Sequence, residues 1–117
     1  MLYTSTEDFF NHIDKLKKNR KLTREEEKEL AQKMKNGDDE AKKALTEAYL
    51  PFLATLLKRY TSTPSLDMIY KGIQVLETSI ATFDFFYDSL SPNVTFVNFL
   101  SNKIKQIMIR YIAEKTI

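Results

Sequence analysis

The sequence predicts an all-α fold, a single domain of about five helices that spans residues 1–117. Two glycines and three prolines are too few for the turns of a β-sandwich or barrel. Most of the chain instead consists of good helix formers, with apolar residues repeated at helical spacing. With 117 residues and 43% apolar composition, the chain is long enough for one hydrophobic core and too short for two ordinary ones.

Composition also narrows the class of function. The chain has no cysteine, one histidine and no glycine-rich phosphate loop, so we expect no catalytic residue, no metal site and no cofactor. It shows neither a signal-like leader nor an apolar run of membrane-spanning length, which predicts a cytoplasmic protein without a membrane partner. The net charge is only +2, so any nucleic-acid site must come from the distribution of charge.

The first two helices are predicted from their end signals. The first is expected over residues 6–19, with Thr6 as N-cap and acidic residues in its first turn. The second follows Thr23, because Thr23 and Glu26 have the spacing of a capping box. Gly37 is the expected C-terminal stop of this helix, since glycine readily adopts positive φ.

The third helix is expected to start at a cap on Asp38 or Asp39 and to contain Pro51. An interior proline removes one backbone hydrogen bond and costs roughly 3 kcal/mol, so we expect either a kink near residues 48–51 or two abutting helices. Ser65 is positioned to cap a fourth helix. The stripe assigned to the core on that helix consists of Leu66, Ile69, Ile73, Leu76, Ile80 and Phe83.

Residues 84–93 are expected to form a loop that carries three consecutive aromatic residues, Phe85, Phe86 and Tyr87. The segment 95–113 then predicts an amphipathic helix when it is turned by about 100° per residue. Its broad apolar side is expected to hold Phe96, Val97, Leu100, Ile104, Ile107, Met108, Tyr111 and Ile112.

Phe99 is the unusual residue of this last helix, because it falls on the polar side near Lys103, Gln106 and Arg110. No acidic residue lies between Asp88 and Glu114. An exposed ring flanked by amides and cations suits stacking on an unpaired base whose phosphates the cations hold. Phe99 could equally cap a neighbouring helix or lie in a dimer contact, and the helix alone leaves these alternatives open.

Three segments, in this order, resemble the bacterial RNA polymerase sigma factors of the sigma-70 family, in a divergent form of regions 1.2 to 2.4. They are LTREEEKELAQKMKNGDDEAKKALTEAYL, LDMIYKGIQVLETSIATFD and TFVNFLSNKIKQIMIRYI, and the resemblance covers roughly residues 6–115. It implies a helical region 2-like domain that is not an enzyme. Such a domain binds core RNA polymerase and recognises the promoter −10 element.

The resemblance also implies binding residues. In sigma factors this domain docks on the clamp coiled coil of the largest polymerase subunit and traps a flipped adenine of the single-stranded non-template −10 element against an aromatic ring. Phe99 matches that ring, Gln106 a base-edge reader, and Lys105 and Arg110 phosphate contacts. The implied DNA-binding set is Phe96, Asn98, Phe99, Asn102, Lys103, Lys105, Gln106 and Arg110. The implied polymerase-binding set is Asp67, Tyr70, Lys71, Ile73 and Gln74.

Several positions depart from the family pattern. Asn102 and Lys103 stand where the family usually has paired tryptophans. No lysine or arginine lies between Lys71 and Lys103, although the family's melting segment is basic. Acidic residues occupy this interval instead: Glu77, Asp84 and Asp88. Tyr70, Lys71 and Ile73 replace the glutamine, glutamate and asparagine typical of the polymerase-facing helix.

These departures favour an alternative function, a sigma-derived interaction module that docks on polymerase or on a regulator and has lost promoter melting. Phe99, Gln106 and Arg110 favour promoter recognition instead. A basic run without an acid at residues 15–24 lies near promoter DNA in the family, and a solvated helix end explains it equally well. Regions 3 and 4 fall outside the resemblance, so we expect a second sigma-like chain or a longer protein to supply them.

Overall fold

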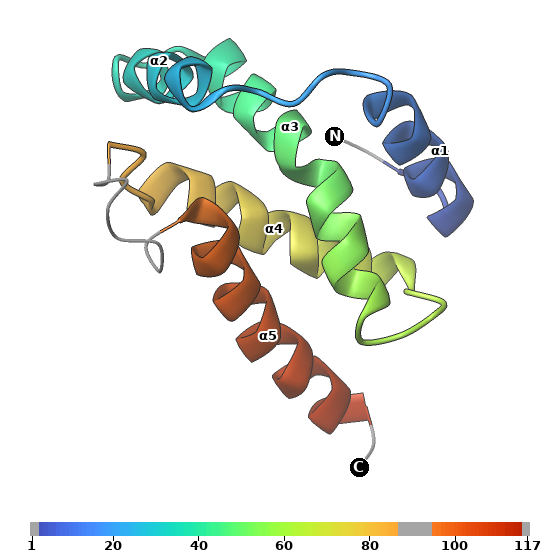
Figure 1. Ribbon diagram of the computed structural model, residues 1–117. Helices are drawn as coiled ribbons and strands as arrows, with labels where there is room; N and C mark the ends of the chain where they lie inside the picture. The colour runs from blue at the N-terminus through green and yellow to red at the C-terminus, as the bar shows by residue number, and fades with distance from the viewer. Residues whose placement is uncertain (1–2, 87–94, 116–117) are drawn as a thin grey trace.

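The computed structural model describes residues 3–86 and 95–115, and these residues form five α-helices with no strand among them (Figure 1). The predicted all-α fold is therefore confirmed. The helices are α1 (Thr6–Leu16), α2 (Arg24–Lys35), α3 (Asp39–Lys58), α4 (Leu66–Thr82) and α5 (Phe96–Lys115).

Local sequence signals set most helix ends. The capping box at Thr23 and Glu26 forms as predicted, and Ser65 accepts a hydrogen bond from the backbone N–H of Met68 at 3.1 Å. Asp38 caps α3 through the backbone N–H groups of residues 40 and 41. The turn before it uses Gly37, whose φ of 92° is the left-handed conformation that glycine tolerates.

The start of α1 differs from the prediction by one residue. Ser5 is the N-cap and accepts a hydrogen bond from the backbone N–H of Asp8 at 3.0 Å, whereas Thr6 lies inside the helix. The hydroxyl of Thr6 instead donates to the carbonyl oxygen of Pro64 at 3.2 Å. This bond ties the first turn of α1 to the connection that precedes α4, so the threonine serves tertiary structure. The helix also ends at Leu16, earlier than predicted.

α3 is one continuous helix of 20 residues that passes through Pro51, so the second of the two predicted alternatives, two abutting helices, is wrong. Packing explains why the helix tolerates the proline. α3 contacts α1, α2 and α4, and Leu50, Leu53 and Leu57 are fully buried. Burying such side chains stabilises by roughly 1.5–3 kcal/mol each, which offsets the cost of an interior proline.

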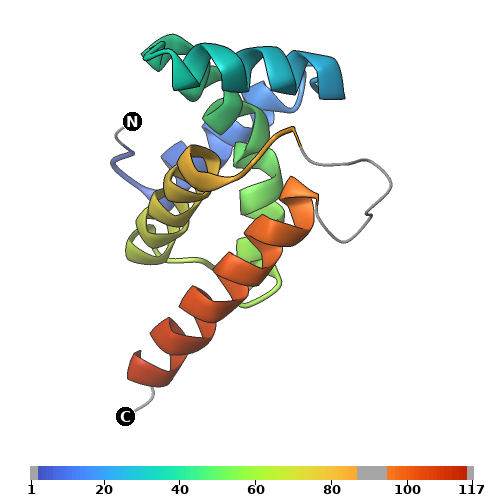
Figure 2. The same ribbon diagram turned by 90° about the vertical axis from the view of Figure 1, so that its left-hand side faces the viewer.

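One hydrophobic cluster contains buried side chains from all five helices. α4 lies between α3 and α5 and packs on both, while the C-terminal end of α5 extends beyond the other helices (Figures 1 and 2). α3 and α4 are close together at Gly72, where an added Cβ would lie 3.2 Å from a methyl carbon of Leu53. The two helices implied in polymerase and DNA binding are therefore neighbours, and each keeps a face outside the core.

Candidate nucleic-acid and polymerase interface

The register of α5 is fixed at its first turn. The hydroxyl and the carbonyl oxygen of Thr95 accept hydrogen bonds from the backbone N–H groups of Asn98 and Phe99, at 3.2 and 3.0 Å. This register turns a narrow stripe of four side chains into the core, which is narrower than the predicted apolar side. Val97 and Ile112 lie outside it and are 41% and 38% exposed. The buried stripe consists of Phe96, Leu100, Ile104 and Met108.

The opposite side of α5 is polar, basic and open to solvent. Six of the eight side chains predicted to contact DNA are exposed there, and the helix carries no acidic residue before Glu114. Ile109, which is 54% exposed, lies among them. Cations and amides on an exposed helix face match the electrostatic requirements of a nucleic-acid strand. The six exposed side chains are Asn98, Asn102, Lys103, Lys105, Gln106 and Arg110.

Phe96 lies outside this exposed surface, and its assignment to the DNA-binding set stays a prediction. Its ring is only 2% exposed, stacks on Phe85 at a centroid distance of 5.2 Å, and contacts Tyr49 at 4.6 Å. Residues from α3, from α5 and from the segment that follows α4 meet at this ring. Phe96 therefore anchors the start of α5 in the core.

Phe99 is half-buried rather than freely exposed. Its ring packs on Phe83, which ends α4, at a centroid distance of 5.1 Å. On the same helix, the Nζ of Lys103 lies over the Phe99 ring, 5.5 Å from its centroid. The ring is therefore held by the core on one side and remains accessible at its outer side, beside Lys103. No local sequence signal indicates the contact with Phe83, because it joins two helices.

On α4, Asp67, Lys71 and Gln74 share one exposed face at the spacing of successive helical turns. Ile73 is only 4% exposed and lies in the core of this structure, so a polymerase contact through its side chain stays a prediction. Helical periodicity had already placed it in the core stripe. Tyr70 is half-buried, and its hydroxyl donates to the carbonyl oxygen of Tyr3 at 2.8 Å.

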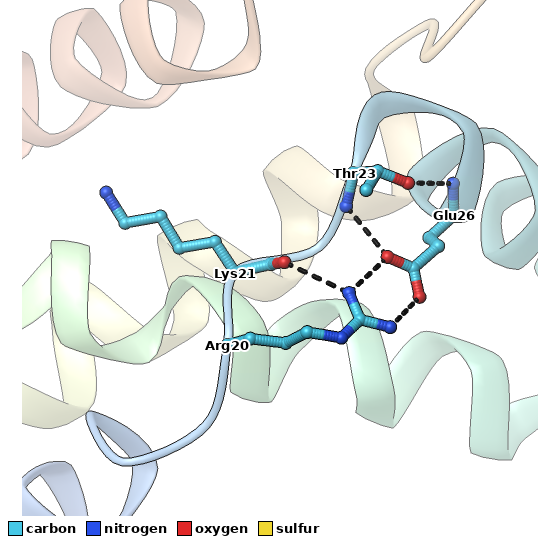
Figure 3. A network of polar contacts seen from close by, with 4 residues as sticks. All are labelled: Arg20, Lys21, Thr23 and Glu26. Carbon is cyan, nitrogen blue, oxygen red and sulfur yellow. Dashed lines mark hydrogen bonds and ion pairs between the residues drawn. The ribbon is translucent and has the colours of Figure 1, made fainter.

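The connection between α1 and α2 holds a polar network (Figure 3). The guanidinium of Arg20 donates two hydrogen bonds to the carboxylate of Glu26, at 2.6 and 2.7 Å. These bonds, together with the backbone N–H of Thr23, lower the pKa of Glu26 to about 2. The charge of Arg20 is thus neutralised within the chain, while Lys17, Lys18 and Lys21 of the basic run are exposed.

A cavity of about 620 Å³ lies between this basic connection, α3 and the first turn of α5. Its lining includes Lys17, Lys21 and Val97. Glu27 also lines it, and accepts a hydrogen bond from the hydroxyl of Tyr49. Burial raises the pKa of Glu27. Sequence reasoning did not identify this cavity, because its walls come from segments far apart in the chain.

The described residues contain neither a membrane-spanning helix nor a cluster of metal ligands. None of their helices is both long and apolar enough to span a membrane. Within the same residues, no three His, Cys, Asp or Glu side chains lie close enough to hold a metal ion. The fold and surface thus define a helical domain with one exposed, basic and amide-rich helix, a class of surface suited to nucleic acid.

Comparison with known proteins finds similarity to sigma factors. Residues 16–40 match the family described as Sigma-70 factor, region 1.2. Over 96 residues, 80% of the chain, it is 35% identical to "RNA polymerase sigma factor SigA" of Clostridium acetobutylicum and 32% identical to the protein of the same name from a Bacillus species. The chain is therefore similar to sigma-70 family factors, in a divergent form. It spans about a quarter of the length of these relatives, since each alignment covers 24% of the relative. No solved structure matches the chain.

Proposed function

We propose that this chain is a sigma-factor-like transcription initiation domain, which binds core RNA polymerase through α4 and recognises the promoter −10 element through α5. The exposed face of α5 carries this proposal, because it combines an aromatic ring with amides and cations and has no acidic residue before Glu114. Similarity to sigma-70 family factors supports it. The proposal also implies a cytoplasmic location, where promoter DNA and polymerase meet.

Each group on α5 has a distinct task in this proposal. Phe99 stacks on an unpaired base with the outer part of its ring, because its inner side is held by Phe83. Gln106 reads a base edge, since an amide can donate and accept hydrogen bonds. Lys105 and Arg110 neutralise phosphates of the strand. Asn98 and Asn102 add hydrogen-bonding groups along the same face.

On α4, the exposed face formed by Asp67, Lys71 and Gln74 is the proposed polymerase contact. Its side chains lie at the i, i+4 and i+7 positions with which one helix commonly contacts another, which suits the helical clamp of the largest polymerase subunit. Tyr70 lies at the edge of this face and bonds the N-terminal segment.

The first test measures binding of a single-stranded −10 oligonucleotide to wild type and to Phe99→Ala. Base stacking on an aromatic side chain is worth about 1–3 kcal/mol, so we expect an affinity loss of about 5- to 150-fold, measured by fluorescence anisotropy at fixed salt. Phe10→Ala is the matched control. Phe10 is also half-buried with a lysine over its ring, since the Nζ of Lys58 lies 4.6 Å from its centroid, but it belongs to α1.

Both variants lose a half-buried ring, so we expect them to be destabilised to a similar extent. Thermal unfolding of the two variants checks this before their affinities are compared. An equal loss of oligonucleotide affinity in the two variants, or none in Phe99→Ala, would contradict the stacking role.

A second function, the interaction module without promoter melting, is favoured by two observations. Asn102 and Lys103 are exposed and polar where the family has tryptophans, and Glu77 and Asp84 are exposed acidic residues near the end of α4. Asp88 and Tyr87 lie outside the described residues. Capture of core polymerase without binding of the oligonucleotide would support this second function and exclude promoter recognition. Duplex opening can be monitored by 2-aminopurine fluorescence. If the chain binds the single strand but does not open the duplex, recognition remains and melting is lost.

A further inference from the structure

Lys103 lies over the ring that is proposed to stack on a base. Its Nζ is 5.5 Å from the centroid of Phe99, one helical turn away on α5. The Lys103 side chain is exposed, and none of the ion pairs found among the described residues involves it. The structure therefore holds this ammonium against an aromatic ring rather than against a carboxylate.

The inner side of the Phe99 ring is closed to a ligand. Phe83 packs there at a centroid distance of 5.1 Å and Phe96 follows at 6.4 Å, and both rings are buried. Protein interiors are packed as densely as organic crystals, so no base enters from this side without disrupting the core. An incoming base must use the solvent side, which Lys103 covers.

A base that stacks on Phe99 must therefore displace the ammonium. An exposed cation–π contact favours the covered state by only about two- to fivefold, and lysine moves easily on its flexible stem. A phosphate is a stronger partner for an ammonium than a phenyl ring is. A base on a phosphodiester strand brings a phosphate that can bind the displaced Lys103 ammonium. An uncharged ligand has no such group, so the lost contact between Lys103 and the ring is not replaced.

We propose that Lys103 covers the Phe99 ring in the free protein and moves to a strand phosphate when an unpaired base stacks there. Lys103 is then a specificity-determining residue, which makes stacking at Phe99 depend on a charged backbone and disfavours uncharged aromatic ligands. This inference rests on the proposed function, because it assigns the outer side of the Phe99 ring to a base.

The test uses Lys103→Met, which keeps the length of the side chain and removes its charge. Two probes of one −10 sequence are compared, a normal single-stranded oligonucleotide and one with uncharged methylphosphonate linkages. We expect the variant to bind the normal strand more weakly than wild type and the methylphosphonate strand about two- to fivefold more tightly. Lys105→Met is the matched control. Lys105 is exposed on the same helix, and loss of its charge should weaken only binding of the normal strand.

Equal affinity of wild type and Lys103→Met for the methylphosphonate strand would overturn the covering role and leave Lys103 as a simple phosphate contact. NMR provides a readout without DNA. The ε-methylene protons of Lys103 should be shifted upfield by the ring current in wild type and not in Phe99→Leu, and should lose this shift as the normal strand is added. Absence of the shift in wild type, with DNA binding intact, overturns this inference alone. Failure of wild type to bind either strand overturns the proposed function and this inference together.

Discussion

At the scale of single residues, the side chains with the clearest physical tasks are those whose partners lie within one or two helical turns. Glu26 shows this best, because one carboxylate closes the capping box with Thr23 and binds the guanidinium of Arg20. Only the capping box was predicted, because its spacing is a local sequence signal. Arg20 was assigned to a basic run, and its neutralisation required knowledge of how the connection folds back.

Arg20→Met should raise the pKa of Glu26 from about 2 toward its ordinary value of 4.5, because the guanidinium is the main cause of the depression. A carboxylate with a lowered pKa in the folded state contributes stability above its unfolded pKa, and that contribution disappears as the pH falls through the folded value. Wild type should therefore lose stability between about pH 4.5 and pH 2, and Arg20→Met should lose less of it.

Carbon-detected NMR titration of the Glu26 carboxyl group and thermal unfolding across this pH range measure the two effects. An unchanged Glu26 midpoint in Arg20→Met would show that the bidentate contact does not form in solution.

At the scale of elements, helical periodicity proved a better guide to side-chain position than motif correspondence. Periodicity placed Ile73 in the core and Phe96 on the apolar side of its helix, and both are buried. The resemblance to sigma factors placed the same two residues at binding surfaces. A match to a family position transfers a role, but it contains no information on how the side chain packs in this chain. The breadth of the apolar side of α5 was overestimated at Val97, since how wide a stripe is buried depends on the neighbours a helix meets.

Gly72→Val should destabilise the fold where α4 approaches α3. A Cβ at this position would lie 3.2 Å from Leu53 and 3.3 Å from Leu57, and valine adds two methyl groups beyond it. Overpacking of this kind typically costs about 1–3 kcal/mol, of which the better helix propensity of valine recovers only part. Urea denaturation followed by circular dichroism measures the loss.

Ala81→Val on the exposed side of α4 is the control for Gly72→Val. Its effect should stay within about 0.7 kcal/mol, which is the range of helix propensities. A destabilisation of the same size in both variants would mean that the close approach at Gly72 is not a packing constraint.

At the scale of the whole molecule, the contacts that determine the arrangement of the helices join residues far apart in the chain. Tyr3 bonds Tyr70 across 67 residues, and Glu27 bonds Tyr49 across 22. Caps and stripes could be predicted because their partners are close in sequence. These long-range pairs could not, since neither partner carries a local signal of the other. The all-α fold followed from composition, whereas the meeting of α4 and α5 required the structure.

Tyr70→Phe should loosen the N-terminal segment from α4. The Tyr70 hydroxyl donates to the carbonyl oxygen of Tyr3 and accepts from its backbone N–H, and Tyr3 is only 8% exposed. Loss of hydrogen bonds to buried backbone groups costs about 1–3 kcal/mol, which urea denaturation should reveal as a lower midpoint.

Tyr111→Phe provides the comparison for this whole-molecule contact. Its hydroxyl lies 3.2 Å from that of Ser65 in an exposed position, so water replaces the bond and the loss should be smaller. Equal midpoints for the two variants would argue against the N-terminal contact as a source of stability.

Phe83 is the C-cap residue of α4. Its ring packs on the buried Phe85 and Phe96 and contacts Phe99 from the core side. Any change at this residue alters the stability of the domain and the position of Phe99 together. If α5 binds DNA as proposed, Phe83 would therefore score as a contact residue in a library of single substitutions selected for DNA binding, although its ring is buried. Only a parallel screen for abundance of the folded protein would separate its two contributions.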